Sequence, residues 1–515
     1  MPSFTEKIGD SNIPIERRIS LLGQFVDKSI DDNSKSNLIE SISLGKDLLK
    51  NVNNDSDSAT VNYFIANAYS GLRMSNQRQK ERDTMPWEDK HLENELIHLR
   101  YAFNEIPSRA SRDQKTDLFF RIATNLGNAL NHIGRFSEAV ELWDFALSRH
   151  PNFAMALGNR GFGLYYYSSV LYDSGHQIVF LSEAKKCLEQ ALKGRLEGGA
   201  KNSFSTIIKH INKIIKDYGE INIKDFSLGR SKIEKEYRTW ALANRLFLNP
   251  LNDLGELSIA ATDILTLPPI VSELKEPPQL YGLYNQVKQE YVSARFLLFE
   301  GIKKSRDRVH FSDKKVLLYN TLDYPVYGIS IEKVKIAFLI AYSVLDKIGF
   351  LLNNYLNLNI PERNIFFRTF WYKSKKKKKE LRNEFRSSKN WPFRGLFWLS
   401  KDFYEKDSGF IESIEPNAKE LNNLRNHIAH KYLKVHDELL WHERHDALDL
   451  FYDNLCYSIK RDDLENKTLK LIKLVRNALI YCALGVHCNE IYKKELNRNI
   501  VFPIYLNTIK DDWKI

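Results

Sequence analysis

Apolar residues recur at helical spacing along most of the chain, and this pattern predicts an all-α fold. In the C-terminal half, four long patterns of this kind cover residues 285–302, 331–356, 417–435 and 467–495. Short β-type runs such as residues 316–320 lie between them. The second pattern is the most apolar, but Asp346 and Lys347 interrupt it. Because each charge would cost about 3 kcal/mol in a bilayer, we expect a core helix here and no membrane contact.

The N-terminal part contains a repeated helix-turn-helix pattern with a period of about 34 residues. The positions that carry it are Leu126, Gly127, Gly134, Ala139, Trp143, Ala146 and Pro151. Small residues let two helices cross closely, a tryptophan fills the gap between neighbours, and a proline ends the second helix. This pattern resembles a tetratricopeptide repeat.

Neighbouring segments repeat the pattern less regularly. One unit continues in register at Gly161, and an earlier unit is read through Ala66 and Ala102, both with polar insertions. Because fewer than three units cannot bury their faces, we expect about four between roughly residues 14 and 218. The predicted domains are therefore tetratricopeptide-like repeats at 1–218, a docked connector at 219–284 and a helical bundle at 285–515.

The pattern at 417–435 combines a clear apolar stripe with a polar back. The stripe consists of Leu421, Leu424, Ile428, Tyr432 and Val435, after Pro416 in the first turn. At about 100° per residue, Asn426 and His430 point away from the stripe, His427 lies to one side, and Arg425 borders it. A helix of this kind is either solvated or half of an interface.

The run from Arg425 to His430 resembles the signature of the HEPN superfamily, an arginine and a polar residue followed at short distance by a histidine. The resemblance implies a helical bundle that dimerises, whose active members are metal-independent endoribonucleases. The combination with tetratricopeptide-like repeats resembles bacterial toxin and defence proteins. It therefore implies an RNA substrate, a homodimer through the bundle, a protein partner or trigger on the repeats, and no cofactor.

The residue types of this motif suit RNA cleavage. An imidazole such as His430 can accept the proton of a ribose 2′-hydroxyl, which then attacks the adjacent phosphorus. A guanidinium such as Arg425 can stabilise the negative charge that develops, and Asn426 can hold the imidazole or a phosphate oxygen. Since Arg425 and His430 lie about 140° apart on an ideal helix, we expect two copies of the chain to complete one site.

Tyr432 follows His430 by two residues, and this spacing resembles HEPN toxins that a partner silences by nucleotidylating the tyrosine. Tyr432 is therefore a candidate for regulatory modification. Its place in the apolar stripe favours a packing role instead.

Positive charge is concentrated in one segment. Residues 281–400 hold 23 basic and 10 acidic residues, an excess larger than the net charge of +11 of the whole chain. Within it, residues 361–400 combine twelve basic residues with ten aromatics, a mixture typical of single-stranded RNA binding. The candidate RNA-binding residues are His427, Lys373, Lys375, Lys376, Lys377 and Arg394. A solvated lysine loop beside aromatics that pack on the bundle explains the composition equally well.

Metal and redox chemistry find little support. The string from His442 to His445 lacks the two-residue spacing between Glu443 and the second histidine that places both imidazoles on one helix face. Four cysteines without paired spacing fit a cytoplasmic protein. The sequence therefore favours a metal-independent endoribonuclease. The alternative is a non-catalytic adaptor that dimerises and binds RNA or protein.

Overall fold

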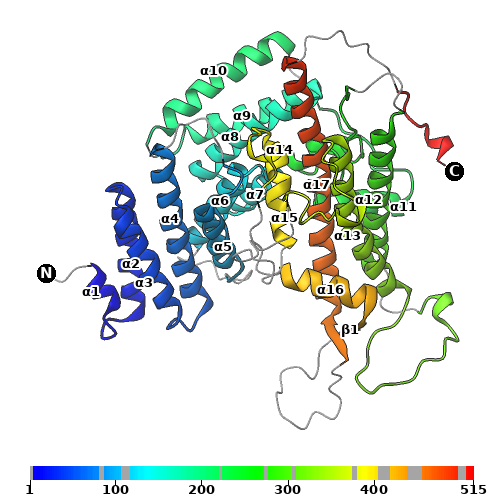
Figure 1. Ribbon diagram of the computed structural model, residues 1–515, viewed down its shortest axis with the longest axis horizontal. Coiled ribbons are helices and arrows are strands. Elements are labelled where there is room, and N and C mark those ends of the chain that lie inside the picture. Colours follow the sequence, from blue (N-terminus) through cyan, green and yellow to red (C-terminus); the bar gives the residue numbers. More distant parts are fainter. Residues whose placement is uncertain are drawn as a thin grey trace.

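The computed structural model describes residues 4–79, 86–105, 116–196, 198–219, 223–271, 277–303, 309–373, 380–403, 418–437, 455–496 and 506–514. These residues are helical apart from one two-stranded ladder and short irregular segments, which confirms the all-α fold. Figure 1 shows the N-terminal helices at one end of the molecule and the C-terminal bundle at the other.

Ten helices that pack against their neighbours in sequence form the N-terminal part. They are α1 Phe4–Gly9, α2 Ile15–Asp31, α3 Lys35–Leu49, α4 Asp55–Gln79, α5 Lys90–Glu105, α6 Thr116–His132, α7 Phe136–Arg149, α8 Ala154–Val170, α9 Ser174–Ala191 and α10 Ala200–Tyr218. Residues 126–151, where the repeat is predicted, include the end of α6 and the whole of α7, and we use the name repeats for the helices α1 to α10. Gly134 turns the chain between α6 and α7 with φ 92°. A Cβ on Gly127 would lie 2.7 Å from Nε1 of Trp143, so only glycine leaves room for the buried indole.

The connector docks on both parts of the molecule. It contains α11 Lys232–Ala243 and the 3-10 turns η1 Pro250–Leu254 and η2 Ser258–Ala260. Asp253 of η1 is buried, forms an ion pair with Arg476 and accepts a hydrogen bond of 2.9 Å from the Tyr167 hydroxyl of α8. A connector residue therefore binds the repeats and the bundle at once.

The C-terminal bundle has the long helices α12 Gln279–Lys303, α13 Ile329–Tyr355 and α17 Arg461–Leu496, with α15 Trp391–Ser400 packed on α17. Three of the four predicted helical patterns correspond to α12, α13 and α17. Short elements complete it: η3 Phe311–Asp313, η4 Glu362–Asn364, α14 Asn383–Arg386, η5 Lys401–Phe403, α16 Ala418–His430 and η7 Asp511–Trp513. Among the described residues, no helix is both long and apolar enough to cross a bilayer.

The fourth predicted helix is too long. Helix α16 ends at His430, and residues Tyr432–His436 form strand β1, which pairs in parallel with β2 Cys456–Lys460. On its other side, Val435 accepts a 2.7 Å hydrogen bond from the backbone N–H of Val326. Hydrogen bonds to β2 and to Val326 satisfy backbone N–H and C=O groups of β1 that would pair within the helix if α16 were longer. The predicted helical stripe is therefore wrong beyond Ile428.

Helix α15 lies between the repeats and the bundle. Its Trp391 indole donates to the carbonyl of Asn131 at 3.0 Å and packs 4.8 Å from the ring of Phe136. A Cβ on Gly395 would lie 2.1 Å from the carbonyl oxygen of Gly134, so the two backbones touch. We call α15 and η5, with the parts of α5, α6 and α7 that they contact, the joint.

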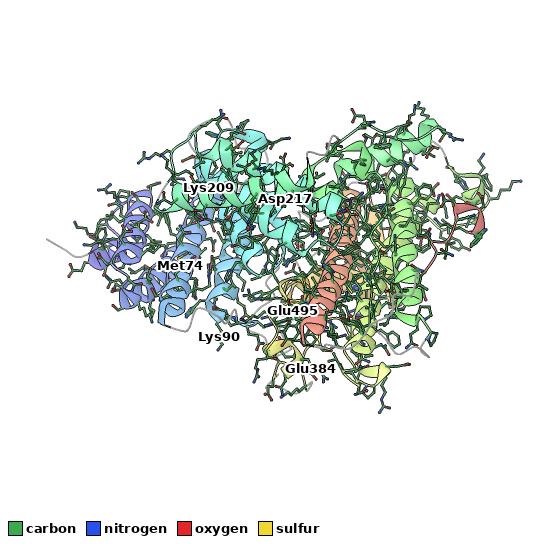
Figure 2. The ribbon with its side chains drawn as sticks, turned by 90° about the horizontal axis from the view of Figure 1, so that it is seen from above. Met74, Lys90, Lys209, Asp217, Glu384 and Glu495 are labelled. Carbon is green, nitrogen blue, oxygen red and sulfur yellow. The ribbon has the colours of Figure 1, made fainter. Side chains whose placement is uncertain are left out.

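The joint extends to the segment before α15. Trp87, which precedes α5, donates from its indole to the carbonyl of Ser388 at 2.8 Å and packs 5.4 Å from the ring of Phe385. Figure 2 shows Lys90 of α5 near Glu384 of α14, in agreement with these contacts. Most aromatics of residues 361–400 are buried and face protein, so the RNA-stacking interpretation is corrected for these rings; Phe366, at 41% exposure, is an exception.

Candidate active site

Helix α16 lies across one end of the bundle, against α13, η5 and β1 (Figure 1). Leu421 and Leu424 are buried and hold it there, while Ala429 and His430 at its C-terminal end are exposed. The expected division into a core face and a polar back is therefore present from Leu421 to His430. This packing determines where each residue of the motif lies.

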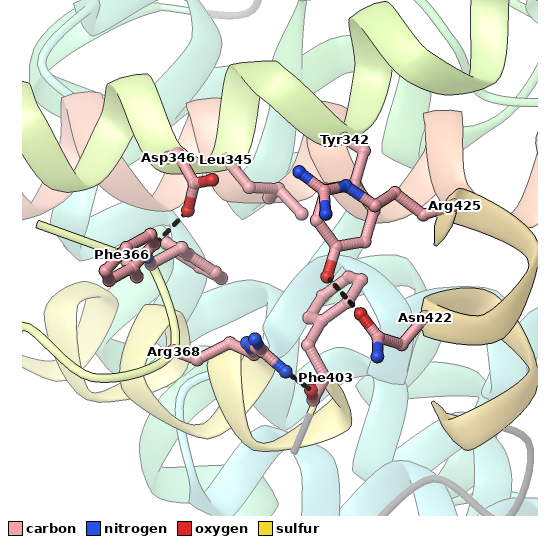
Figure 3. Close-up of a pocket in the computed structure, with 9 residues that line it drawn as sticks. Tyr342, Leu345, Asp346, Phe366, Arg368, Phe403, Asn422 and Arg425 are labelled. Atoms are coloured by element: carbon pink, nitrogen blue, oxygen red, sulfur yellow. Dashed lines mark hydrogen bonds between the residues drawn. The ribbon is translucent and has the colours of Figure 1, made fainter. Parts of the chain in front are cut away.

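Arg425 reaches from α16 toward α13. Its guanidinium lies 5.6 Å from the ring centre of Tyr342, a cation–π contact, and donates from Nη1 to Oδ1 of Asn426 at 3.1 Å. Figure 3 shows Arg425 and Asn422 beside Tyr342, with Asp346 and Phe366 on the opposite side of the pocket. The aromatic face and the amide oxygen hold the guanidinium half-buried at the pocket wall.

The pocket collects side chains from four separate segments around a cavity of about 90 Å³. Its lining combines aromatic rings with polar and charged groups: Tyr342, Leu345, Asp346, Phe366, Phe367, Arg368, Phe403, Asn422 and Arg425. Sequence reasoning did not identify Asp346, Arg368 or Tyr342 as site residues. The one available signal was a charged residue, Asp346, within an apolar helix.

Asp346 is the acidic group of this pocket. Its Oδ1 accepts a hydrogen bond of 2.9 Å from the backbone N–H of Phe367. Burial raises the pKa of the Asp346 carboxyl, although that hydrogen bond and the positive charges of Arg368 and Arg425 act in the opposite direction. The pocket therefore holds a carboxyl and two guanidinium groups between aromatic walls.

The structure separates the other motif residues. Asn426 contacts Arg425, as the hydrogen bond above shows. His427 packs on the ring of Tyr457 in β2, with centroids 5.1 Å apart, and its Nδ1 lies 2.8 Å from the carbonyl oxygen of Asn423. His430 is exposed at the end of α16 and is not part of the pocket lining. His427 therefore has a clear packing role, whereas His430 faces solvent.

The candidate RNA-binding residues fall into three groups. Lys373 is exposed and forms an ion pair of 3.2 Å with Glu380. Lys375, Lys376 and Lys377 lie outside the described residues. Arg394 is only 2% exposed and donates from Nη1 to the carbonyl of His132 at 2.9 Å, and burial lowers its pKa to about 10. Arg394 therefore belongs to the joint, and its prediction as an RNA-binding residue is corrected.

Tyr432 does not lie in an apolar stripe. It begins β1, is 38% exposed and has the Lys434 ammonium 5.4 Å from its ring centre. The packing argument against its modification therefore no longer applies.

The structure describes only part of the histidine-rich stretch. His436 is buried, and His442 and His445 lie outside the described residues. Within the part of the chain that the structure describes, no group of three or more His, Cys, Asp or Glu side chains is arranged to hold a metal ion.

Comparison with known families agrees with this part of the fold. Residues 271–489 match the family described as LA2681-like HEPN, which supports placing the C-terminal region in the HEPN superfamily. The matched segment includes α12, α13, α15, α16 and most of α17, and hence the whole pocket. No family match covers the repeats, and no curated protein matches the chain.

Proposed function

We propose that the chain is a metal-independent endoribonuclease, a toxin or defence effector, with its site at Arg425 and His430 of α16. One observation carries the proposal: the guanidinium lies at the wall of a polar pocket, and an exposed imidazole follows on the same helix. The HEPN match supports a ribonuclease or nucleotide-related role for this region.

The proposed reaction needs only groups of the chain and the RNA. His430 accepts the proton of the 2′-hydroxyl, and the 2′-oxygen forms a bond to the adjacent phosphorus. The bond from phosphorus to the 5′-oxygen breaks, and that oxygen takes the proton that the His430 imidazolium carries, which leaves a 2′,3′-cyclic phosphate and a 5′-hydroxyl. Arg425 stabilises the charge on the phosphorane, and Asn426, which accepts a hydrogen bond from Arg425, keeps the guanidinium oriented.

We further propose that a second copy of the chain completes the site. Arg425 faces the pocket while His430 faces solvent, so the two groups of one chain diverge. A two-fold axis near the end of α16 would bring the His430 imidazole of one copy to the Arg425 guanidinium of the other.

An exposed apolar segment supports this arrangement. Residues 309–327, which we call the arm, include Leu317 at 85% exposure and Tyr319 at 87%. Val309, Phe311, Val316 and Tyr324 of the arm are exposed as well, and groups of exposed apolar side chains often mark contact surfaces. The arm returns to the bundle beside β1 through the Val326–Val435 hydrogen bond, close to the end of α16. A second copy seated on the arm would therefore lie beside His430.

The joint supports a regulatory role for the repeats. Asp402 of η5 forms ion pairs with Arg100 of α5 and Arg135 of the α6–α7 turn, both at 2.7 Å. The next residue, Phe403, lines the pocket and accepts a 3.3 Å hydrogen bond from Arg368. A movement of the repeats that displaces Asp402 would therefore also displace the adjacent Phe403, which forms part of the pocket wall.

Incubation of labelled RNA with the full chain in EDTA tests the catalytic proposal. We expect fragments that end in 2′,3′-cyclic phosphate, and a loss of about 10²–10⁴ in rate for His430→Ala. Arg425→Ala should be similarly impaired, whereas Arg363→Ala, which removes an exposed arginine of η4, should not. RNA that stays intact with the wild-type chain would contradict the proposal and favour the non-catalytic adaptor.

Light scattering at micromolar concentration tests the second copy. Wild type should be dimeric, and Leu317→Asp should be monomeric because a charge in an apolar contact is costly. Ile39→Asp, which alters an exposed apolar residue of α3, is the matched control and should stay dimeric. A monomeric wild-type chain would refute the arm as a contact between copies.

A further inference from the structure

The pocket beside Arg425 has the composition of a small-molecule site. Its cavity of about 90 Å³ is smaller than pockets that enclose drug-sized ligands, which measure about 300–1,000 Å³, so it takes the edge of a small ring system while the rest of the ligand lies in the open mouth. Aromatic rings of Tyr342, Phe366 and Phe403 contribute to its walls, and Figure 3 shows these rings around the polar groups. Such walls suit a flat, aromatic ligand.

Phe366 is the most accessible of these rings. It lies on the segment after α13 and is 41% exposed, whereas its neighbour Phe367 is buried. Exposed aromatic rings next to basic side chains stack unpaired nucleobases. The position of Phe366 therefore points to a base rather than to an aliphatic group.

Asp346 determines which hydrogen-bonding pattern the pocket accepts. An ionised carboxylate only accepts hydrogen bonds, and its two oxygens offer about four acceptor positions. The backbone N–H of Phe367 occupies one position on Oδ1 and orients the group. A half-buried carboxylate of this kind, with its pKa raised by burial, gains most from a ligand that brings two donors side by side.

Guanine matches this requirement better than the other RNA bases. Its N1–H and N2 amino group present two adjacent donors, whereas adenine and cytosine offer one amino donor next to an acceptor nitrogen. Uracil offers one donor between two acceptors. A carboxylate can therefore pair with both donors of guanine and with one donor of any other base.

We propose that the pocket binds the guanine base of the nucleotide next to the scissile phosphate. The Asp346 carboxylate accepts hydrogen bonds from the guanine N1–H and N2 amino group, and the Phe366 ring stacks on the guanine ring. Arg425, at the pocket wall, then contacts the phosphate attached to that nucleoside. The position of this guanine beside a scissile phosphate rests on the proposed ribonuclease function, whereas the preference for guanine over other bases rests on the residues of the pocket.

Calorimetric titration of the full chain with GMP and with AMP tests the pocket without requiring cleavage. Wild type should bind GMP at least about tenfold more tightly than AMP, which corresponds to about 1.4 kcal/mol. Asp346→Asn keeps the shape and the acceptor for the Phe367 N–H but replaces one acceptor oxygen with a donor. We expect this variant to lose the preference.

Two further variants separate recognition from folding. Phe366→Ala removes an exposed ring and should weaken GMP and AMP alike, by about tenfold or more. Glu362→Gln, which neutralises an exposed carboxylate of η4 nearby, should leave both affinities unchanged. Equal binding of GMP and AMP by wild type, or an unchanged preference in Asp346→Asn, would overturn the guanine pocket.

Sequencing of cut ends from a random RNA library places the pocket relative to the cleaved bond. We expect guanine to be enriched at one position next to the cut, and the enrichment to disappear in Asp346→Asn. Cleavage without any guanine bias would overturn the placement while leaving the ribonuclease intact. A preference for GMP in a chain that cuts no RNA would instead support the pocket and overturn the proposed reaction.

Discussion

Asp402 is a buried charge of the joint, with 1% of its surface exposed, and it faces two guanidinium groups. Arg100 donates from Nη1 to Oδ1 at 2.7 Å and from Nη2 to Oδ2 at 3.2 Å, and Nη1 of Arg135 lies 2.7 Å from Oδ2. Replacement of Asp402 by Asn keeps the volume but leaves two buried cations without their carboxylate. Removal of one partner from a buried ion pair typically costs about 3–5 kcal/mol.

Arg135 keeps a second carboxylate, that of Glu138, so the loss should not exceed this range. We therefore expect Asp402→Asn to lower the free energy of unfolding by about 3–5 kcal/mol. Asp47→Asn removes an exposed ion pair with Lys50 and is the matched control. It should change the free energy of unfolding by less than about 1 kcal/mol.

The pH dependence follows from the same contacts. Burial alone would raise the pKa of Asp402, but the charges of Arg100 and Arg135 outweigh burial and lower it. A carboxyl with a lowered pKa stabilises the fold above its ordinary value of about 3.9, and this contribution disappears as the pH falls through the folded-state pKa. The difference between wild type and Asp402→Asn should therefore persist from pH 5 to 8 and shrink under strongly acidic conditions.

Urea denaturation measures the free energy, and hydrogen exchange locates the loss. We expect faster exchange in α5 and α6 as well as in α15, because the pair joins the repeats to the bundle. A loss below about 1 kcal/mol, equal to that of Asp47→Asn, would refute the argument that the joint depends on Asp402.

Three further predictions concern the pocket, the joint and metal independence. Because burial raises the pKa of Asp346, the protonated carboxyl favours folding, and this contribution to stability is lost as the pH rises. Asp346→Asn should therefore have a higher melting temperature than wild type at pH 8 but not at pH 4. A lower melting temperature of the variant at pH 8 would contradict this. Gly395→Ala places a Cβ 2.1 Å from the Gly134 carbonyl and should cost about 1–3 kcal/mol in urea denaturation, whereas Gly282→Ala meets nothing within 4 Å and should be neutral or stabilising. RNA cleavage should proceed at the same rate with and without EDTA, and recovery of activity only after added Mg²⁺ or Zn²⁺ would count against a metal-independent reaction.

The long helices could be predicted because only an α-helix would bury the apolar residues of their patterns together. In α13 and α17, apolar residues at helical spacing are buried on several sides, and no alternative structure places them so well. The end of α16 was mispredicted because Tyr432 and Val435 continue the helical spacing and also suit a strand. Pairing with β2, whose partners are 24 residues further along the chain, decided between the two.

The role of residues 361–400 could not be decided from the sequence, for another reason. Composition shows that lysines and aromatics are adjacent in sequence, but not which of them face protein. Trp371 and Trp398 are buried, whereas Lys373 of the same segment is exposed. The buried rings form part of the joint, a role that depends on the shape of the distant α5–α7 surface.

The candidate site was predictable in part. The motif on α16 is local, so Arg425, Asn426 and His430 could be proposed from spacing alone. Asp346 and Arg368 could not, because the pocket combines segments that are distant in sequence, as the contact between Tyr342 and Asn422, 80 residues apart, illustrates. Only the packing of α16 on α13 brings them together.

Complementation between two inactive chains tests most directly whether Arg425 and His430 of different copies form one site. An Arg425→Ala chain and a His430→Ala chain should each leave RNA intact. After unfolding and refolding as an equal mixture, half of the dimers carry both chains, and one of their two sites has both groups. The account predicts about one quarter of wild-type activity in the mixture; no recovery, with mixed dimers shown to be present, would contradict it.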